Sequence, residues 1–237
     1  MRAPRQFFRR RRGLAAAAAG LAAALAVAPR SAAADGDWQQ WTEVSWTQTL
    51  GNGLDLGLRW EGHWEEDLSQ FAYHEVEPML LWRWSPRWDF GVGYERDERW
   101  VPMAEVNHVP NVSATFRLPR QPWKLLPALD GRLANRSRLD FLLPEDAARE
   151  WRPIFRNRTE WETRWRWGGN ELVPFLFEEW LFDLRAGAFV QNRLGVGLGI
   201  PLLPHWLARI YAMRLDEKIA GVWKWHPVVG VQIQTQF

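Results

Sequence analysis

The chain has 237 residues, with 30 basic and 28 acidic side chains, 18 tryptophans and no cysteine. The absence of cysteine excludes disulfides, thiol catalysis and zinc sites built from cysteine. Seven basic and no acidic residues lie in 1–34, so the remainder carries a net charge of −5. A nucleic-acid partner, which needs a basic surface, therefore has no electrostatic support.

The first 34 residues have the layout of a cleaved export signal. Six arginines in MRAPRQFFRRRRG precede the apolar run LAAAAAGLAAALAVA and the small residues at 32–34. This order is typical of a secretory signal, and the apolar run is too short for a membrane-spanning helix. We therefore expect a signal peptide at 1–34, cut after Ala34, and an exported domain at 35–237. The general and twin-arginine export routes are not distinguished.

Apolar and polar residues alternate through the exported part. In LDLGLRWEGHWE, for example, Leu56 and Leu58 share one face, and Asp55 and Arg59 share the other. Such alternation predicts strands with one apolar and one polar face. Pro78 falls inside a predicted strand, where we expect a β-bulge. The predicted strands, each long enough to cross a membrane when tilted, are 38–50, 54–65, 71–84, 88–99, 106–118, 125–141, 151–167, 171–183, 188–200, 206–215 and 226–237.

The links between the predicted strands alternate in length. GNG, SPR, PRQP, WGGN and PLLPH are short, whereas EEDLSQ, 100–105, LLPEDAARE, DLRAGA and DEKIAGVWKW are longer. Outer-membrane barrels have short periplasmic turns and longer outer loops. Tryptophan favours the boundary between hydrocarbon and headgroups. We expect one belt near the short turns, at Trp84, Trp88, Trp123, Trp165, Trp167 and Trp206, and one near the long loops, at Trp60, Trp64, Trp100, Trp151, Trp180 and Trp223.

These features predict an all-β fold: a transmembrane, antiparallel, up-and-down β-barrel of 10–12 strands that follows a cleaved signal peptide. Bacterial barrels have an even strand number, which leaves both chain ends in the periplasm. We therefore expect that one of the eleven segments is split or that one is missing. The closing strand VVGVQIQTQF ends in Phe237, which predicts recognition by the barrel-assembly machinery. The alternative is a secreted sandwich or lipocalin-like barrel, whose apolar face is buried.

Several motifs resemble one family. They are WTEVSW (41–46), NRSRLD (135–140), FRNRTEWE (155–162), PFLFEEWLFD (174–183) and QNRLGVGLGI (191–200). In their order and spacing they resemble domain of unknown function 2490 (DUF2490), over essentially the whole exported part. The resemblance implies a bacterial outer-membrane barrel and supplies no reaction.

The polar faces predict a charged barrel interior, with acidic residues from early strands opposite arginines from later ones. Two arrangements remain open. One is a narrow pore for small polar or charged solutes, oriented by the charged walls. The other is a non-conducting structural barrel filled by ion pairs. The expected lumen-lining residues are Glu61, Glu75, Glu77, Glu95, Arg136, Arg138, Arg156, Arg158, Glu160, Glu179, Arg193 and Arg209.

An enzyme is the least favoured class. The sequence contains neither G-x-S-x-G nor H-E-x-x-H. His63, which shares a face with Glu61 and Glu65, is the best acid–base candidate for an outer-membrane lipid-modifying enzyme. A histidine among carboxylates is more often a charged partner than a base. We expect no catalytic residues, no cofactor and no metal site. The expected partners are outer-membrane lipid, the barrel-assembly machinery and small polar solutes.

Overall fold

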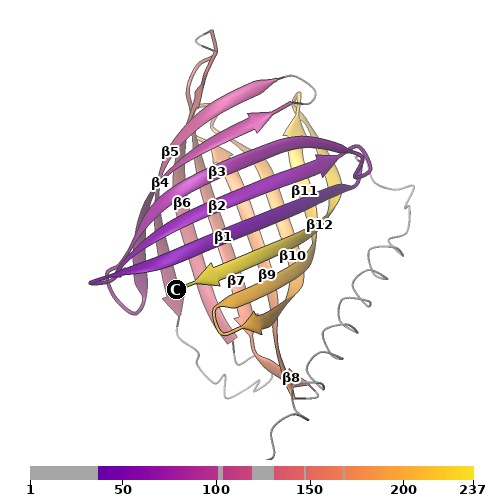
Figure 1. Ribbon diagram of the computed structural model, residues 1–237. Coiled ribbons are helices and arrows are strands. Elements are labelled where there is room, and N and C mark those ends of the chain that lie inside the picture. The colour runs from indigo at the N-terminus through magenta and orange to yellow at the C-terminus, as the bar shows by residue number, and fades with distance from the viewer. Residues whose placement is uncertain (1–36, 101–103, 119–130, 147, 168) are drawn as a thin grey trace, which may run out of the picture. The chain divides into compact units, whose positions relative to one another are not determined.

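A closed β-barrel runs from Gln39 to Gln236. The computed structural model describes residues 37–100, 104–118, 131–146, 148–167 and 169–237, so the expected signal peptide and Trp123 lie outside the described residues. No helix that could span a membrane occurs within these ranges. The strands around the barrel are β1 (Gln39–Gly51), β2 (Leu54–Glu65), β3 (Gln70–Arg83), β4 (Trp88–Arg99), β5 (Glu105–Leu118), β6 (Gly131–Pro144), β7 (Arg152–Thr163), β9 (Asn170–Asp183), β10 (Ala188–Leu203), β11 (Trp206–Ile219) and β12 (Val222–Gln236) (Figure 1).

The short strand β8 (Trp165–Trp167) stands apart from this ring. It pairs only with the first residues of β9, from Asn170 to Leu172. The resulting hairpin projects past the rim of the barrel, as Figure 1 shows. The closed ring among the described residues therefore contains eleven strands.

The ring closes through a parallel pair. β1 and β12 run side by side from Gln39↔Val228 to Thr47↔Gln236, whereas the other neighbouring strands are antiparallel. An up-and-down ring with an odd strand number must contain one parallel pair, because its first and last strands point the same way. The expectations of an even number, of antiparallel pairing throughout and of both chain ends on one side were therefore wrong. We call the rim where β1 begins the A rim and the rim where β12 ends the B rim.

Phe237 is anchored at the B rim by the backbone of β1. Its N–H donates to the carbonyl of Thr47 (2.9 Å), and its carbonyl accepts from the N–H of Thr49 (2.8 Å). Its ring stacks on His205, with 5.5 Å between the ring centroids. The last residue thus completes the seam of the barrel.

Most predicted strands coincide with observed ones, but the long link predicted at DEKIAGVWKW is wrong. Ala220 and Gly221, both with positive φ, make a two-residue turn at the A rim, where DEKIAGVWKW predicted a long loop. Such turns match the twist of an antiparallel hairpin, so β11 and β12 extend to meet them. β6 begins at Gly131, and the predicted residues 125–130 lie outside the described part.

Pro78 lies within β3 without a bulge. The β3–β4 register is the same on both sides of it, at Val76↔Arg96 and Met79↔Gly93, and the two intervening positions are unpaired. Proline has no N–H to donate, so the β3–β4 hydrogen bonding is interrupted here and resumes in the same register, with no extra residue. The predicted bulge was wrong.

Burial is inverted relative to a water-soluble barrel. Among the described residues, 32 large hydrophobic side chains are exposed, and buried polar residues outnumber buried hydrophobic ones by 20 to 11. Exposed tryptophans lie near both rims: Trp100, Trp151 and Trp223 near the A rim, and Trp84, Trp88, Trp165, Trp167 and Trp206 near the B rim. The apolar faces therefore point outward, against the sandwich and lipocalin-like alternatives.

One part of the interior is apolar, which the alternation did not predict. It comprises Trp41, Phe175, Phe177, Tyr211, Met213, Leu215 and Val228. Glycines on the neighbouring strands leave room for its rings, since a Cβ on Gly230 would lie 1.9 Å from the ring of Tyr211. The interior therefore has an ionic part and a smaller aromatic and aliphatic part.

Candidate functional site: the barrel interior

All twelve expected lumen-lining residues lie at inward-facing positions. Seven of them are buried: Glu61, Glu75, Glu77, Glu95, Arg138, Glu179 and Arg209. The other five are partly buried: Arg136, Arg156, Arg158, Glu160 and Arg193. Alternation places them there because every second side chain of a barrel strand points toward the axis.

Arg138 of β6 is a central connector of the interior. Its guanidinium donates to Glu77 of β3 (2.8 Å) and to Glu95 of β4 (2.6 Å), and its Nε donates to Asp140. The side chain is only 4% exposed. A forked guanidinium with three carboxylate partners fixes the spacing of three strands.

Arg59 of β2 is the second connector, and it lies within the acidic side. It contacts Glu61 (3.0 Å), Glu77 (2.7 Å) and Glu95 (3.3 Å), and it also contacts Glu75. The expected acidic wall therefore carries its own counter-ion. Arg59 was not among the expected lumen-lining residues, although its spacing from Glu61 already placed it on the same face.

The arginine side has a matching internal carboxylate. Glu179 of β9, which is 1% exposed, lies near Arg156 of β7 (3.3 Å), Arg193 of β10 (3.1 Å) and Arg136 of β6 (3.8 Å). Arg156 also lies 3.6 Å from Asp140. Asp140 was another residue absent from the expected set, although it follows Arg138 at the spacing of one strand face.

The ion pairs form one continuous network. It passes from Arg59 through Glu77, Arg138, Asp140, Arg156 and Glu179 to Arg193, and so connects β2 with β10 through β3, β6, β7 and β9. The guanidinium of Arg193 lies 4.7 Å from the ring centroid of Trp41 on β1. The charged and the apolar parts of the interior therefore meet around the axis.

A second set of contacts covers the aromatic rings toward the B rim. Arg209 of β11 contacts Glu160 (2.5 Å) and Glu162 (3.3 Å) of β7, and its guanidinium lies 3.9 Å from the centroid of Phe175. Arg158 lies 4.0 Å from the centroid of Phe177. These cation–π contacts hold arginine side chains across the lumen.

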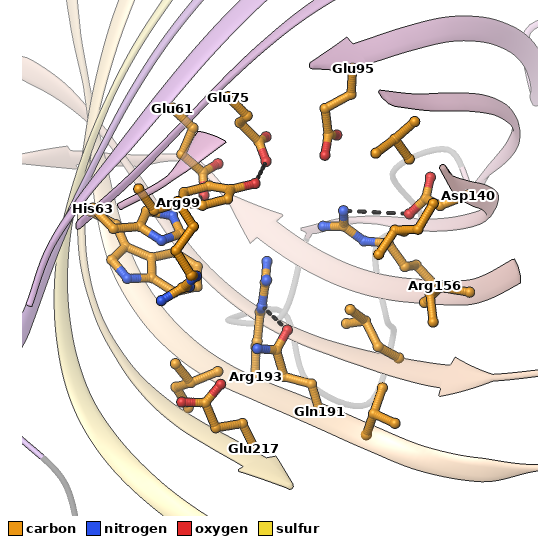
Figure 2. Close-up of a pocket in the computed structure, with 18 of the residues that line it drawn as sticks. Glu61, His63, Glu75, Glu95, Arg99, Asp140, Arg156, Gln191, Arg193 and Glu217 are labelled. Atoms are coloured by element: carbon orange, nitrogen blue, oxygen red, sulfur yellow. Dashed lines mark hydrogen bonds and ion pairs between the residues drawn. The ribbon is translucent and has the colours of Figure 1, made fainter. Parts of the chain in front are cut away.

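A cavity of about 300 Å³ lies in the interior between the ion-pair network from Arg59 to Arg193 and the A rim. Figure 2 shows Glu61, Glu75 and Glu95 on one side of it, and Arg156 and Arg193 on the other. Its lining also includes the aliphatic side chains Val109, Leu142, Ile154, Leu181, Val190 and Leu215.

His63 lies at the edge of this cavity and contacts one of its two expected carboxylate partners. Its Nε2 is 2.7 Å from Oε1 of Glu61, and its ring stacks on Trp41 with 3.9 Å between the centroids. Glu65 pairs with Arg99 instead (3.0 Å). No serine, threonine or lysine lines the cavity among the residues the structure describes. The geometry therefore places His63 in a stack on Trp41 and in a hydrogen bond with Glu61, with the ring of Tyr73 4.5 Å away between centroids.

Within the described residues, no group of three or more histidine, cysteine, aspartate or glutamate side chains could hold a metal ion.

Comparison with known proteins assigns the family. No curated protein matches the chain. The family model described as "Protein of unknown function (DUF2490)" matches residues 38–224, which include the strands from β1 to β11 and the start of β12. The match contains all twelve lumen-lining residues and both connectors, so the chain belongs to the DUF2490 family.

Proposed function

We propose that the protein is a bacterial outer-membrane β-barrel whose lumen is closed to solutes by ion pairs. In this proposal residues 1–34 are the export signal, cut after Ala34. The observation that carries the proposal is the inverted burial, with apolar residues outside and charged residues inside a closed sheet.

A lipid environment explains the outer surface. Val92 (55% exposed) and Val196 (63%) lie in the middle of their strands, where water would meet a continuous apolar band. Each Å² of apolar surface in water costs about 25 cal/mol relative to an apolar environment. Closure of the sheet also pairs the backbone groups, which hydrocarbon requires of any spanning structure. The two groups of exposed tryptophans match the two interfaces of a bilayer.

The ion-pair network supports the closed lumen over the pore. A pore would require Arg138 to leave Glu77 and Glu95, all three of which are buried. Separation of a buried pair costs about 3–5 kcal/mol when one partner is lost. Closed interiors filled by side chains are also usual in small barrels. The pore for small polar solutes remains the competing outcome of the test below.

The proposed partners follow from the same surfaces. The outer-membrane lipids would contact the apolar band, and the barrel-assembly machinery would recognise the last strand with Phe237. The seam between β1 and β12 supports this role, because Phe237 is the residue whose backbone completes it.

Conductance and location test the proposal together. The protein should fractionate with outer membranes and change its gel mobility on heating. Purified protein in planar bilayers should pass no more current than lipid alone. The variant Arg59→Ser/Glu77→Ser/Arg138→Ser should conduct, because it removes the centre of the network. Steady conductance of the unaltered barrel would support the pore instead, and recovery of the protein in the soluble periplasm would overturn the membrane assignment.

A further inference from the structure

The cavity near the A rim has two sides of opposite charge. Four carboxylates on β2–β4 contact two guanidinium groups, those of Arg59 and Arg138; the carboxylates are Glu61, Glu75, Glu77 and Glu95. Arg138 also forms an ion pair with Asp140. His63 adds positive charge here only when it is protonated. This side of the cavity therefore has an excess of negative charge.

The opposite side is rich in arginine, and Asp140 and Glu217 also line the cavity there (Figure 2). Arg136, Arg156 and Arg193 all lie within 4 Å of the single carboxylate of Glu179. Arg156 and Arg193 line the cavity, whereas Glu179 does not. The labelled guanidinium groups of both residues point toward the middle of the cavity in Figure 2. An anionic group would therefore be attracted to this side.

The charged groups on the two sides are held in place by partners within the barrel. Oε1 of Glu75 lies against the guanidinium of Arg59, and Oε2 of Glu75 accepts from the hydroxyl of Tyr73. Arg156 donates to Glu179 (3.3 Å). A ligand in the cavity would therefore meet charged side chains that are already oriented.

The aliphatic lining lies mainly on the strands that carry the arginines. Leu142 is on β6, Ile154 on β7, Leu181 on β9 and Val190 on β10. The volume of about 300 Å³ is at the lower end of the range for small-molecule sites. Sites of this kind combine an apolar lining with a few convergent polar groups.

We propose that this cavity binds a small zwitterion of the amino-acid class, with its ammonium toward Glu75 and Glu95, its carboxylate toward Arg156 and Arg193, and an aliphatic side chain on Leu142, Ile154, Leu181 and Val190. The inference rests on the proposed function, because the ion pairs that close the lumen form the inner boundary of the cavity. Both charges of the ligand are needed, since either one alone leaves one side of the cavity unmatched.

Three probes with the same aliphatic body test this requirement. They are leucine, 3-methylbutylamine, which lacks the carboxylate, and 4-methylpentanoate, which lacks the ammonium. Binding is measured by titration calorimetry on the folded full-length protein in detergent. Leucine should bind saturably and at least tenfold more tightly than either analogue. No binding of leucine, or equal binding of an analogue, would overturn the inference.

Two variants test which side of the cavity binds the carboxylate of the ligand and which side binds its ammonium. Arg193→Gln should weaken leucine binding at least tenfold and leave 3-methylbutylamine unchanged. Glu75→Gln should weaken leucine binding and leave 4-methylpentanoate unchanged. Arg214→Gln is the matched control, because Arg214 pairs with Asp216 outside the cavity and its side chain is 59% exposed. Equal losses in all three variants would contradict the assigned geometry, provided that each retains heat-modifiable mobility.

The experiment is independent of the membrane and conductance assays. A barrel that is closed and located in the outer membrane but does not bind leucine retains the proposed function and loses this inference. A barrel that binds leucine but conducts retains the site and loses the closed lumen.

Discussion

Replacement of Arg138 by methionine tests the energetic role of the network. The change retains an unbranched apolar stem and removes a guanidinium that is 4% exposed and contacts Glu77, Glu95 and Asp140. Loss of one partner from a buried ion pair costs about 3–5 kcal/mol. The lower end is expected here, because Arg59 still contacts Glu77 and Glu95. We therefore expect Arg138→Met to lower the free energy of unfolding by about 3 kcal/mol.

The assay is urea unfolding of the barrel in phospholipid vesicles, followed by tryptophan fluorescence. Arg214→Met is the control, because the exposed Arg214–Asp216 pair should contribute less than about 1 kcal/mol. The double variant Arg138→Met/Glu77→Gln should be less destabilised than the sum of its single variants, by about 1–3 kcal/mol. If Arg138→Met and Arg214→Met cost the same, the buried network does not hold the strands together as argued.

Three further predictions address the outer surface, the aromatic interior and the last residue. Val92→Arg, in the middle of the apolar band, should destabilise the barrel in vesicles by about 2–4 kcal/mol, whereas Val222→Arg at the A rim should cost about 0–1 kcal/mol; equal unfolding energies would contradict a lipid-facing band. Gly230→Ala should lower the free energy of unfolding by about 1–3 kcal/mol in the same urea assay, because its Cβ meets the Tyr211 ring. Tyr211→Leu in the same chain should remove most of this loss, and additive effects of the two substitutions would refute the overlap. Phe237→Ala should reduce the amount of barrel in outer membranes, measured by immunoblot, while the refolded protein keeps its heat-modifiable mobility; unchanged membrane levels would exclude a role in recognition.

The positions of strands and the direction of their side chains follow from the sequence alone. The alternation around Leu56 and Arg59 is a local pattern with a period of two residues, so it places strand and face without reference to any other strand. The same pattern was sufficient to turn Glu61, Arg138 and Arg193 inward. The tryptophans beside the predicted links also lie near the two rims, which the position of the links predicted and the alternation did not.

The partners of these side chains could not be predicted from the sequence. The contact of Arg138 with Glu77 joins residues 61 positions apart, and it depends on the barrel circumference and on the register of the intervening strands. Phe175 and Phe177 share the inward face with Glu179, but only the glycines on neighbouring strands show that their rings fill the interior. The missed connectors Arg59 and Asp140 had the correct spacing, and their importance appeared only when several carboxylates converged on them.

The sequence by itself determined the strands, their apolar and polar faces and the family, because each depends on residues that are near neighbours in the chain. Only the tertiary structure decided the odd strand number, the parallel closure of β1 on β12 and the location of the cavity. These depend on which strand completes the ring and on how side chains meet across its axis. A pattern that repeats every two residues along one strand contains no information about either.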